Sequence, residues 1–247
     1  MNITDEQDTQ ILLPKPILSL PLAILVAGIL VAGAIAWTNG SGNVASVGEP
    51  KEDNLVATSI PVMPISSADH YRGSPTAPVI VLEFSDTECP FCKNFHSTMR
   101  QLLADEPEKV AWVYRHAPIL GLHKKAFTEA VATECAAELG GDDAFWDYLD
   151  MLFEITPAND GLDLDQLPEI AVSVDLDRDT FLECQSSGRH DERIEGNLND
   201  ALAAGPGSTP WSVVMTRDGS VMYPISGAMP LSVMKQVVNV ALAKSVK

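Results

Sequence analysis

The chain of 247 residues has few basic side chains: 16 lysines and arginines stand against 34 acidic residues, and the net charge is −18. Nucleic-acid binding depends on clustered lysines and arginines that contact phosphates, so this balance argues against a nucleic-acid partner. The acidic residues are spread along the chain, which is typical of a solvated surface. Hydrophobic residues make up 46% of the chain, which is enough for the core of one or two domains.

Cysteine is also scarce. Four cysteines are too few for a small disulfide-rich protein, and their spacing is uneven. Cys89 and Cys92 lie three positions apart, whereas Cys135 and Cys184 each stand alone. This spacing predicts two different roles for the two sets of cysteines.

Charge is absent from residues 17–37, ILSLPLAILVAGILVAGAIAW, a run of 21 residues. About 20 apolar residues cross a bilayer as a helix, and this run shows no polar face, so we predict a transmembrane helix. Ala34-Ile35-Ala36 resembles a cleavage site, but the run is longer than the roughly 7–15 apolar residues of a signal peptide, which favours an uncleaved anchor. Lys15 precedes the span and the next basic residue is Lys51. The positive-inside rule then places residues 1–16 in the cytoplasm and the rest of the chain outside.

Residues 38–73 are rich in Gly, Ser, Asn, Pro and Ala and show no sustained periodicity, so we expect a flexible linker before a domain at 74–247. The apolar, β-branched run 79–84 (VIVLEF) predicts a buried strand, and 109–114 (KVAWVY) predicts a second. The helix expected at 90–104 lies between them. Strand, helix and strand form a βαβ unit, so these two strands should be parallel.

The rest of the domain divides into a helical block and a terminal hairpin. Residues 123–204 have helical periodicity throughout and predict an insertion of several helices. Two alternating runs, 211–215 and 220–224, flank Asp218-Gly219, which is a strong hairpin signal. An amphipathic helix at 230–244 follows. Without the insertion, the order βαβ then ββα predicts an α/β core of four strands and two helices.

The close cysteine pair lies at the expected start of the helix after the first strand. Pro90 suits the first helical position, which places Cys89 at the N-cap, next to free backbone N–H groups and the positive end of the helix dipole. That position stabilises a thiolate and lowers the pKa of Cys89, although Asp86 and Glu88 would oppose the charge. We therefore predict that Cys89 is an exposed nucleophile and Cys92, one turn on, its buried partner.

A metal-binding module is the alternative for this motif. Cys89, Cys92 and His96 lie roughly on one helical face and could supply three ligands. Tetrahedral zinc sites usually take a second pair of ligands from another element, and the remaining cysteines are single and distant in sequence. A redox pair is therefore favoured over a metal site.

Thr209-Pro210 stands directly before a predicted strand. A proline entering a strand donates no hydrogen bond to the sheet and needs a special geometry. A cis peptide bond at Pro210, which would turn the chain beside the cysteine pair, fits this position.

The run 74–244 resembles the DsbA-like branch of the thioredoxin fold, on the segments APVIVLEFSDTECPFCKNFH, VYRHAPI, AFTEAVATECAAELGGDDAFWDYLDMLFE, FLECQSSG, GSTPW and ISGAMP. The resemblance implies an α/β thioredoxin-like fold with a helical insertion, here preceded by an N-terminal transmembrane helix. It also implies thiol–disulfide exchange with cysteine-containing proteins outside the cytoplasm, without a bound cofactor. A quinone-linked membrane partner would reoxidise the cysteine pair.

The resemblance also assigns roles to single residues. Cys89 matches the attacking cysteine and Cys92 its partner, while Pro210 matches a cis proline. Thr209 would offer backbone hydrogen bonds to a bound substrate peptide. Glu83 matches a buried acid that transfers protons to or from Cys92; the alternative is a strand-end carboxylate in water, but its place inside an apolar run favours burial.

Phe91 departs from the pattern of the strong oxidases of this family, which carry histidine before the second cysteine. A phenyl ring cannot stabilise a thiolate as an imidazole can, so the pair should be less oxidising. Oxidation of substrate thiols is the predicted direction, with a reductase or isomerase as alternatives.

Cys135 and Cys184 each fall in a predicted helix of the insertion. Two free buried thiols are one interpretation. In an oxidising compartment a structural disulfide between them is favoured.

Overall fold

The computed structural model describes residues 58–205 and 207–245, which belong to one compact unit, Glu49–Lys247. Within these two ranges, every helix is too short or too polar to span a bilayer. The predicted tail at 1–16 and the predicted transmembrane segment at 17–37 lie outside the described residues.

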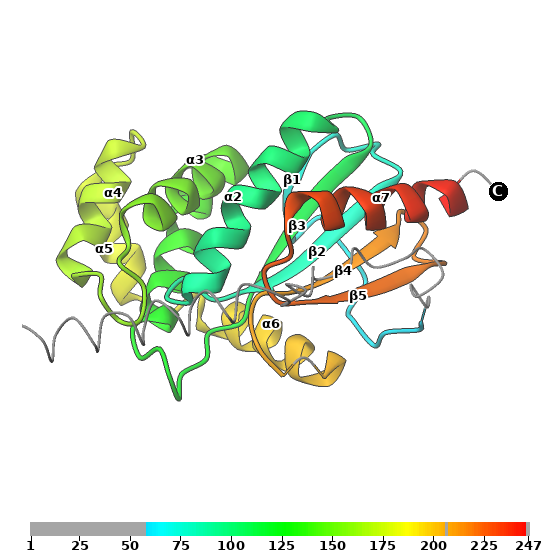
Figure 1. The fold of residues 1–247 in the computed structure, drawn as a ribbon. Coiled ribbons are helices and arrows are strands. Elements are labelled where there is room, and N and C mark those ends of the chain that lie inside the picture. Colours follow the sequence, from blue (N-terminus) through cyan, green and yellow to red (C-terminus); the bar gives the residue numbers. More distant parts are fainter. Residues whose placement is uncertain (1–57, 206, 246–247) are drawn as a thin grey trace, which may run out of the picture. The chain divides into compact units, whose positions relative to one another are not determined.

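A mixed five-stranded sheet forms the centre of the unit (Figure 1). Its order is β1-β3-β2-β4-β5. The strands are β1 His70–Gly73, β2 Val79–Ser85, β3 Val110–His116, β4 Trp211–Thr216 and β5 Met222–Ser226. β2 and β3 are parallel and the other pairs are antiparallel, so the predicted βαβ unit and hairpin are confirmed.

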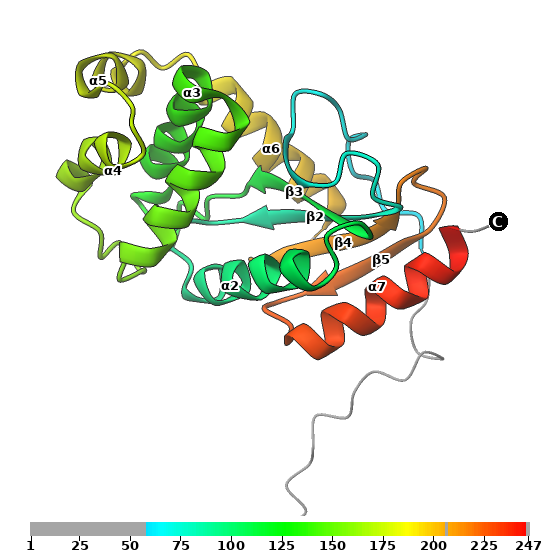
Figure 2. The same cartoon turned by 90° about the horizontal axis from the view of Figure 1, so that it is seen from above.

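Helices cover both faces of the sheet. In Figures 1 and 2, α2 (Pro90–Asp105) and α7 (Leu231–Ser245) lie on one face, and α6 (Asp191–Ala204) lies on the other. The remaining helices gather at one end of the sheet and form most of the predicted insertion: α3 Ala126–Ile155, the short 3₁₀ turn η2 Leu164–Gln166, α4 Leu167–Ser173 and α5 Arg178–Ser186.

The side chains of β2 alternate between the two layers, and all seven residues of the strand are buried. Val79 and Val81 join the core beneath α2 and α7, whereas Ile80 and Leu82 join the core on the α6 side. Successive side chains of a strand point to opposite faces, so Glu83 lies on the same side as Val81. The carboxyl group therefore projects toward the layer that contains the cysteine pair.

The sheet begins earlier than the sequence predicts. Residues 38–73 are predicted above as a flexible linker, but His70–Gly73 forms β1, which pairs antiparallel with β3. The residues before β1 are also packed: Ile60 is buried, and the buried Arg115 binds Asp69 at 2.7 Å. The sequence HYRG has no apolar alternation, so pattern reading cannot detect this strand.

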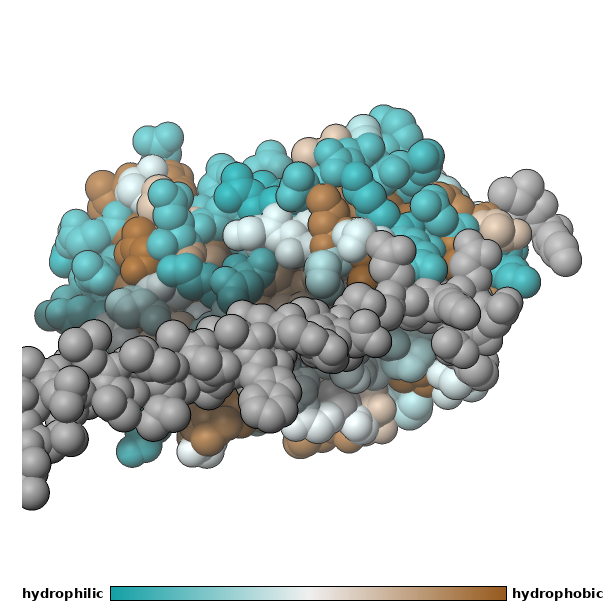
Figure 3. Space-filling model, viewed as in Figure 1, coloured by the Kyte–Doolittle hydropathy of each residue, from teal (hydrophilic) through white to brown (hydrophobic). Residues whose placement is uncertain are grey.

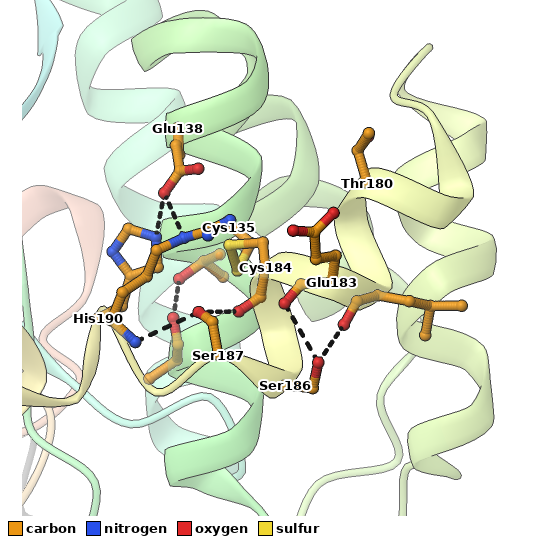
Figure 4. Close-up of a disulfide and its surroundings, with 12 residues drawn as sticks. Cys135, Glu138, Thr180, Glu183, Cys184, Ser186, Ser187 and His190 are labelled. Carbon is orange, nitrogen blue, oxygen red and sulfur yellow. Dashed lines mark hydrogen bonds and ion pairs between the residues drawn. A yellow bond between two sulfur atoms is a disulfide. The ribbon is translucent and has the colours of Figure 1, made fainter.

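Cys135 of α3 and Cys184 of α5 are joined by a disulfide, the pairing that the sequence favours (Figure 4). Both residues are fully buried in a second hydrophobic core made by the insertion helices. His190 lies beside the bond, with its Nε2 2.9 Å from Oε2 of Glu138. The disulfide therefore fastens α5 to α3 at the end of the sheet.

The coloured surface in Figure 3 is mainly hydrophilic, and hydrophobic residues appear there in small separate groups. This agrees with the net charge of −18, which keeps a protein surface solvated.

Replacing both Cys135 and Cys184 with alanine should lower the free energy of unfolding by about 4 kcal/mol, because the bond closes a loop whose ends are 49 residues apart. Urea denaturation without reductant measures this loss. Each single alanine variant should lose a similar amount, since each breaks the same bond. A double variant as stable as the wild type would contradict a stabilising role.

Candidate active site

Cys89 lies where the chain leaves β2 and enters α2. Its backbone is extended, with φ −80° and ψ 121°, and Pro90 takes the first helical position, as the sequence predicts. The backbone N–H of Lys93 donates to the carbonyl of Cys89 at 3.1 Å, which closes the first turn. Cys89 is therefore the N-cap residue, and its sulfur lies at the end of α2 where backbone N–H groups are free.

The pairing of β4 with β2 brings a second loop to this sulfur. Phe84 lies opposite Trp211 in the antiparallel ladder, so the residues just before Trp211 meet the residues just after Phe84. The Thr209-Pro210 peptide bond is cis. The Sγ of Cys89 lies 3.5 Å from the carbonyl oxygen of Thr209. The structure thus brings together the cysteine pair and the Thr-Pro motif, which are far apart in the sequence.

Cys89 is less exposed than the sequence predicts. Only 5% of its surface is accessible, whereas the neighbouring Phe91 is 62% exposed. The reason is the loop at Thr209, which covers one side of the sulfur. Cys92 is fully buried, as predicted.

The pKa values of the two thiols are shifted in opposite directions. The pKa of Cys89 is lowered to about 6, chiefly by a hydrogen bond from the Cys92 thiol and also by the backbone N–H groups of Cys92 and Phe91, against the opposing effect of burial. The pKa of Cys92 is raised well above its ordinary value, first by burial and then by its proximity to Cys89. The pair therefore has one thiol that ionises readily and one that holds its proton.

Glu83 is fully buried and lies on the side of the sheet that faces the pair. The indole N–H of Trp112, from the neighbouring strand β3, donates to its Oε2 at 2.9 Å, while its Oε1 has no partner among the described residues. Burial raises the pKa of Glu83 to about 7. A carboxyl group with this pKa can take up or release a proton near neutral pH.

Asp86 and His123 form a contact that sequence reasoning missed. The Asp86 carboxylate accepts hydrogen bonds from the Ile119 N–H at 2.7 Å, the His123 Nδ1 at 2.9 Å and the Glu88 N–H at 2.8 Å. Its own backbone N–H donates to the Sγ of Cys92 at 3.4 Å. No sequence signal links Asp86 to His123, because 37 positions separate them.

The alternative metal site has no support in this geometry. Nε2 of His96 lies 2.6 Å from the Asp150 carboxylate. Within residues 58–205 and 207–245, the ligand atoms of Cys89, Cys92 and His96 are not gathered within 4.8 Å of one another.

The sheet order, the cysteine pair at the start of α2 and the facing Thr209-Pro210 loop are those of a thioredoxin-like fold. The family model described as Thioredoxin matches residues 66–217, more than half of the chain. The chain therefore belongs to the thioredoxin family.

Solved structures with a similar fold include DsbA proteins. Pseudomonas aeruginosa DsbA2 is 24% identical with a TM-score of 0.61, over 71% of this chain and 96% of that one. BdbD from Bacillus subtilis, in its oxidised form, is 22% identical with a TM-score of 0.64, over 75% of this chain and 98% of that one. These likenesses establish a DsbA-like fold with a helical insertion.

Curated relatives by sequence are larger proteins. The Na(+)/H(+) antiporter NhaA 3 of Salinispora tropica is 35% identical over 162 residues, which are 64% of this chain and 23% of the antiporter. The antiporter NhaA 1 of Salinispora arenicola is 33% identical over the same shares. The chain thus spans about a quarter of the length of these relatives.

Replacing Glu83 with glutamine should change the pH dependence of stability. A carboxyl group whose pKa rises from 4.5 to about 7 on folding contributes stability at low pH that is lost as the pH rises through this window. Between pH ~4.5 and ~7, the free energy of unfolding should therefore fall less steeply with rising pH in the variant than in the wild type. The two slopes should differ by about 1.4 kcal/mol per pH unit. Urea denaturation at several pH values measures the difference.

The exposed Glu108 provides a matched control, because glutamine there makes the same chemical change on the surface. The control variant should follow the wild-type curve. Equal slopes for the wild type and the Glu83 variant would show that Glu83 ionises in the folded protein as it does in water.

Proposed function

We propose that this protein is a thiol–disulfide oxidoreductase that exchanges disulfides with cysteine-containing proteins through Cys89 and Cys92. The observation that carries the proposal is the asymmetry of the pair. Cys89, with a pKa of about 6, lies against the Thr209 loop, while Cys92 is buried with a pKa well above its ordinary value. One sulfur is suited to attack and to leave, and the other to close the disulfide.

An apolar cavity beside Thr209 supports a polypeptide substrate. It has a volume of about 180 Å³ and is lined by Ala117, Ile119, Leu198, Ala201, Leu202, Gly207, Ser208 and Thr209. Phe91, between Pro90 and Cys92 in the sequence, exposes its ring and adds apolar surface beside the cysteine pair. Apolar surface of this kind suits segments of unfolded protein, whose hydrophobic side chains are still uncovered.

As an oxidase, the oxidised protein would be attacked at the Sγ of Cys89 by a substrate thiolate. The Cys89–Cys92 bond breaks, its electron pair passes to Cys92, and a mixed disulfide with Cys89 forms. The Cys92 thiolate then takes a proton. Glu83 is the proposed donor, because it is buried and its carboxylate acts on Cys92 by raising the pKa of that thiol. A second substrate thiolate then attacks the mixed disulfide, and Cys89 leaves as a stabilised thiolate. The substrate loses two electrons and the cysteine pair gains them.

The low pKa of Cys89 favours this direction. At pH 7 a thiol with a pKa of about 6 is mostly ionised, whereas an ordinary thiol with a pKa of 9.0 is mostly protonated. That difference stabilises the reduced pair by about 1.4 kcal/mol, which makes the disulfide about 30 mV more oxidising. The effect is moderate, in keeping with Phe91 in place of a thiolate-stabilising histidine.

The proposal includes a location and an electron partner. The uncharged run 17–37 is long enough to anchor the chain in a bilayer, with the catalytic domain outside the cytoplasm. An oxidising compartment also suits the disulfide between Cys135 and Cys184. The reduced pair would return its electrons to a quinone-linked membrane protein, by analogy with the DsbA-like fold.

The direct test mixes the oxidised protein with a reduced, unfolded protein and counts free thiols by alkylation. The wild type should oxidise the substrate, and Cys89→Ser should be inactive. Cys92→Ser cannot form the Cys89–Cys92 disulfide, so it is mixed instead with a substrate protein that contains a disulfide. Its Cys89 thiolate should attack that bond, release one substrate thiolate and remain joined to the substrate in a mixed disulfide, because the resolving sulfur is gone. No mixed disulfide with Cys92→Ser would overturn the proposal. A reduction potential near −270 mV rather than near −120 mV would reverse the direction to that of a reductant.

The topology is tested separately by adding protease to intact cells from which any outer layer has been removed. The domain that contains Cys89 should be digested, and a tag placed before residue 17 should survive. A domain protected from protease while the cells stay closed would contradict the proposed orientation.

A further inference from the structure

Glu88, the residue before Cys89, is fully buried, and its side chain lies within hydrogen-bonding reach of Glu129, which is also fully buried. Glu129 belongs to the first turn of α3, so the contact joins the loop before α2 to the insertion. We call these two residues the carboxyl pair. The exchange reaction proposed above does not use these two buried acids, although Glu88 directly precedes Cys89.

Most oxygens of the carboxyl pair lack a close donor. Oε1 of Glu88 and both carboxyl oxygens of Glu129 are buried and form no close hydrogen bond among the described residues, and Oε2 of Glu88 accepts a 3.3 Å bond from the Gly161 N–H. The Thr87 hydroxyl also acts on Glu129 and lowers its pKa, but it offers one O–H for two carboxyl groups. Ionised carboxylates accept hydrogen bonds but cannot donate them. Two of them facing each other in a dry site would repel, so a proton between them supplies the missing donor and removes one charge.

The charges that act most strongly on Glu129 are acidic. Asp86 adds a further negative charge from the loop before α2, and Tyr148 faces Glu129 from the second half of α3. The nearby His123 is bound to Asp86, and no ion pair from a basic side chain reaches Glu88 or Glu129 in the part of the chain that the structure describes. Burial and the bond to Glu88 together raise the pKa of Glu129 to about 9.

The backbone around the pair is also fastened to the active-site loop. The Asn159 N–H donates to the carbonyl of Glu88 at 2.8 Å, and the Lys125 N–H at the start of α3 donates to Asp160 Oδ1 at 2.9 Å. Ala158, Asn159 and Asp160 all have positive φ, between 54° and 64°, a conformation that side chains other than glycine rarely adopt. These contacts hold that turn against the residue that precedes Cys89.

We propose that Glu88 and Glu129 share a single proton, and that this proton-bridged pair is a positioning device that locks the Cys89 loop to the start of α3. Glu88 is covalently joined to Cys89, so a pair that lost its proton would force two like charges apart and displace the sulfur from the Thr209 loop. The role in positioning rests on the proposed exchange function, whereas the shared proton does not.

The shared proton is tested by the stability of the full-length chain in a Cys89→Ser background, where no Cys89 thiolate forms. A group that holds its proton only when folded makes the unfolding equilibrium constant rise about tenfold per pH unit between its unfolded and folded pKa values. Glu129→Gln in that background should lower the rise by one such tenfold step per pH unit between pH ~5 and ~9, because the amide keeps the shape and donates to Glu88 without titrating. Below pH ~7 the part of the slope that comes from Glu83 should remain. Urea denaturation across this range measures the slope.

Two further variants make the result specific. Glu88→Gln should narrow the pH range of the rise, because Glu129 loses its acidic partner while its own burial remains, and it provides the test if Glu129→Gln does not fold. Glu195→Gln makes the same change at an exposed position of α6 and should keep the parent slope. Unchanged slopes in both pair variants would overturn the shared proton.

Positioning is tested by the rate at which the reduced chain, with both active-site cysteines, attacks a small aromatic disulfide. Cys89 is already ionised above pH 7, so its own titration adds little there. Between pH 8 and pH 10 the protonated fraction of a group with a pKa of about 9 falls about tenfold, and the rate should fall with it. The rate of Glu129→Gln should stay flat across this range.

The outcomes separate the two proposals. A wild-type rate that stays flat, while the stability slope still depends on Glu129, would show a shared proton that does not position Cys89. A chain that fails to exchange disulfides with proteins at any pH would overturn the proposed function but leave the stability result standing.

Discussion

The antiparallel pairing of β4 with β2 is the constraint on which the site depends. It places Trp211 opposite Phe84, so the loop that ends in Thr209-Pro210 must meet the loop that leads into α2. The parallel pairing of β2 with β3 then supplies Trp112 to Glu83 from the other side. β2, whose seven residues are all buried, is thus the central strand against which β3, β4 and their site residues are aligned.

Burial at the end of β2 creates an electrostatic problem, because three acids fall within six residues there: Glu83, Asp86 and Glu88. Each is accommodated differently. Glu83 accepts the indole N–H of Trp112 and has a raised pKa, whereas Asp86 accepts two backbone N–H groups and His123. Glu88 lies against Glu129. The acids that the sequence sets against the Cys89 thiolate are therefore occupied with other partners.

The local chemistry of the site can be predicted from the sequence, because it depends on neighbours in the chain. Pro90 fixes the start of α2, and therefore the N-cap position of Cys89, within a single turn. The strand and helix order is equally local, since it rests on hydrophobic periodicity. The burial of Cys92 follows from its position one turn into the helix, and the burial of Glu83 follows from its place inside an apolar strand. These features yield the α/β core, the insertion and the central residues.

What sequence reasoning misses depends on contacts between distant segments. His123 finds Asp86 only because the chain after β3 returns to the end of β2, and Glu129 meets Glu88 from the insertion. The strand His70–Gly73 becomes recognisable only in the folded structure, where it pairs with β3 and the preceding Asp69 forms an ion pair with Arg115. The reduced exposure of Cys89 arises in the same way, from a loop that lies 120 positions away.

The disulfide of the insertion has a consequence for how the protein matures. Cys135 and Cys184 are sealed in the core that α3 and α5 make together, so the bond has to be formed while those helices are still assembling. A newly made chain therefore needs an oxidant to complete this bond. In the proposed reaction, older copies can meet that need, which would make the protein one of its own substrates and its production self-sustaining once a first generation exists.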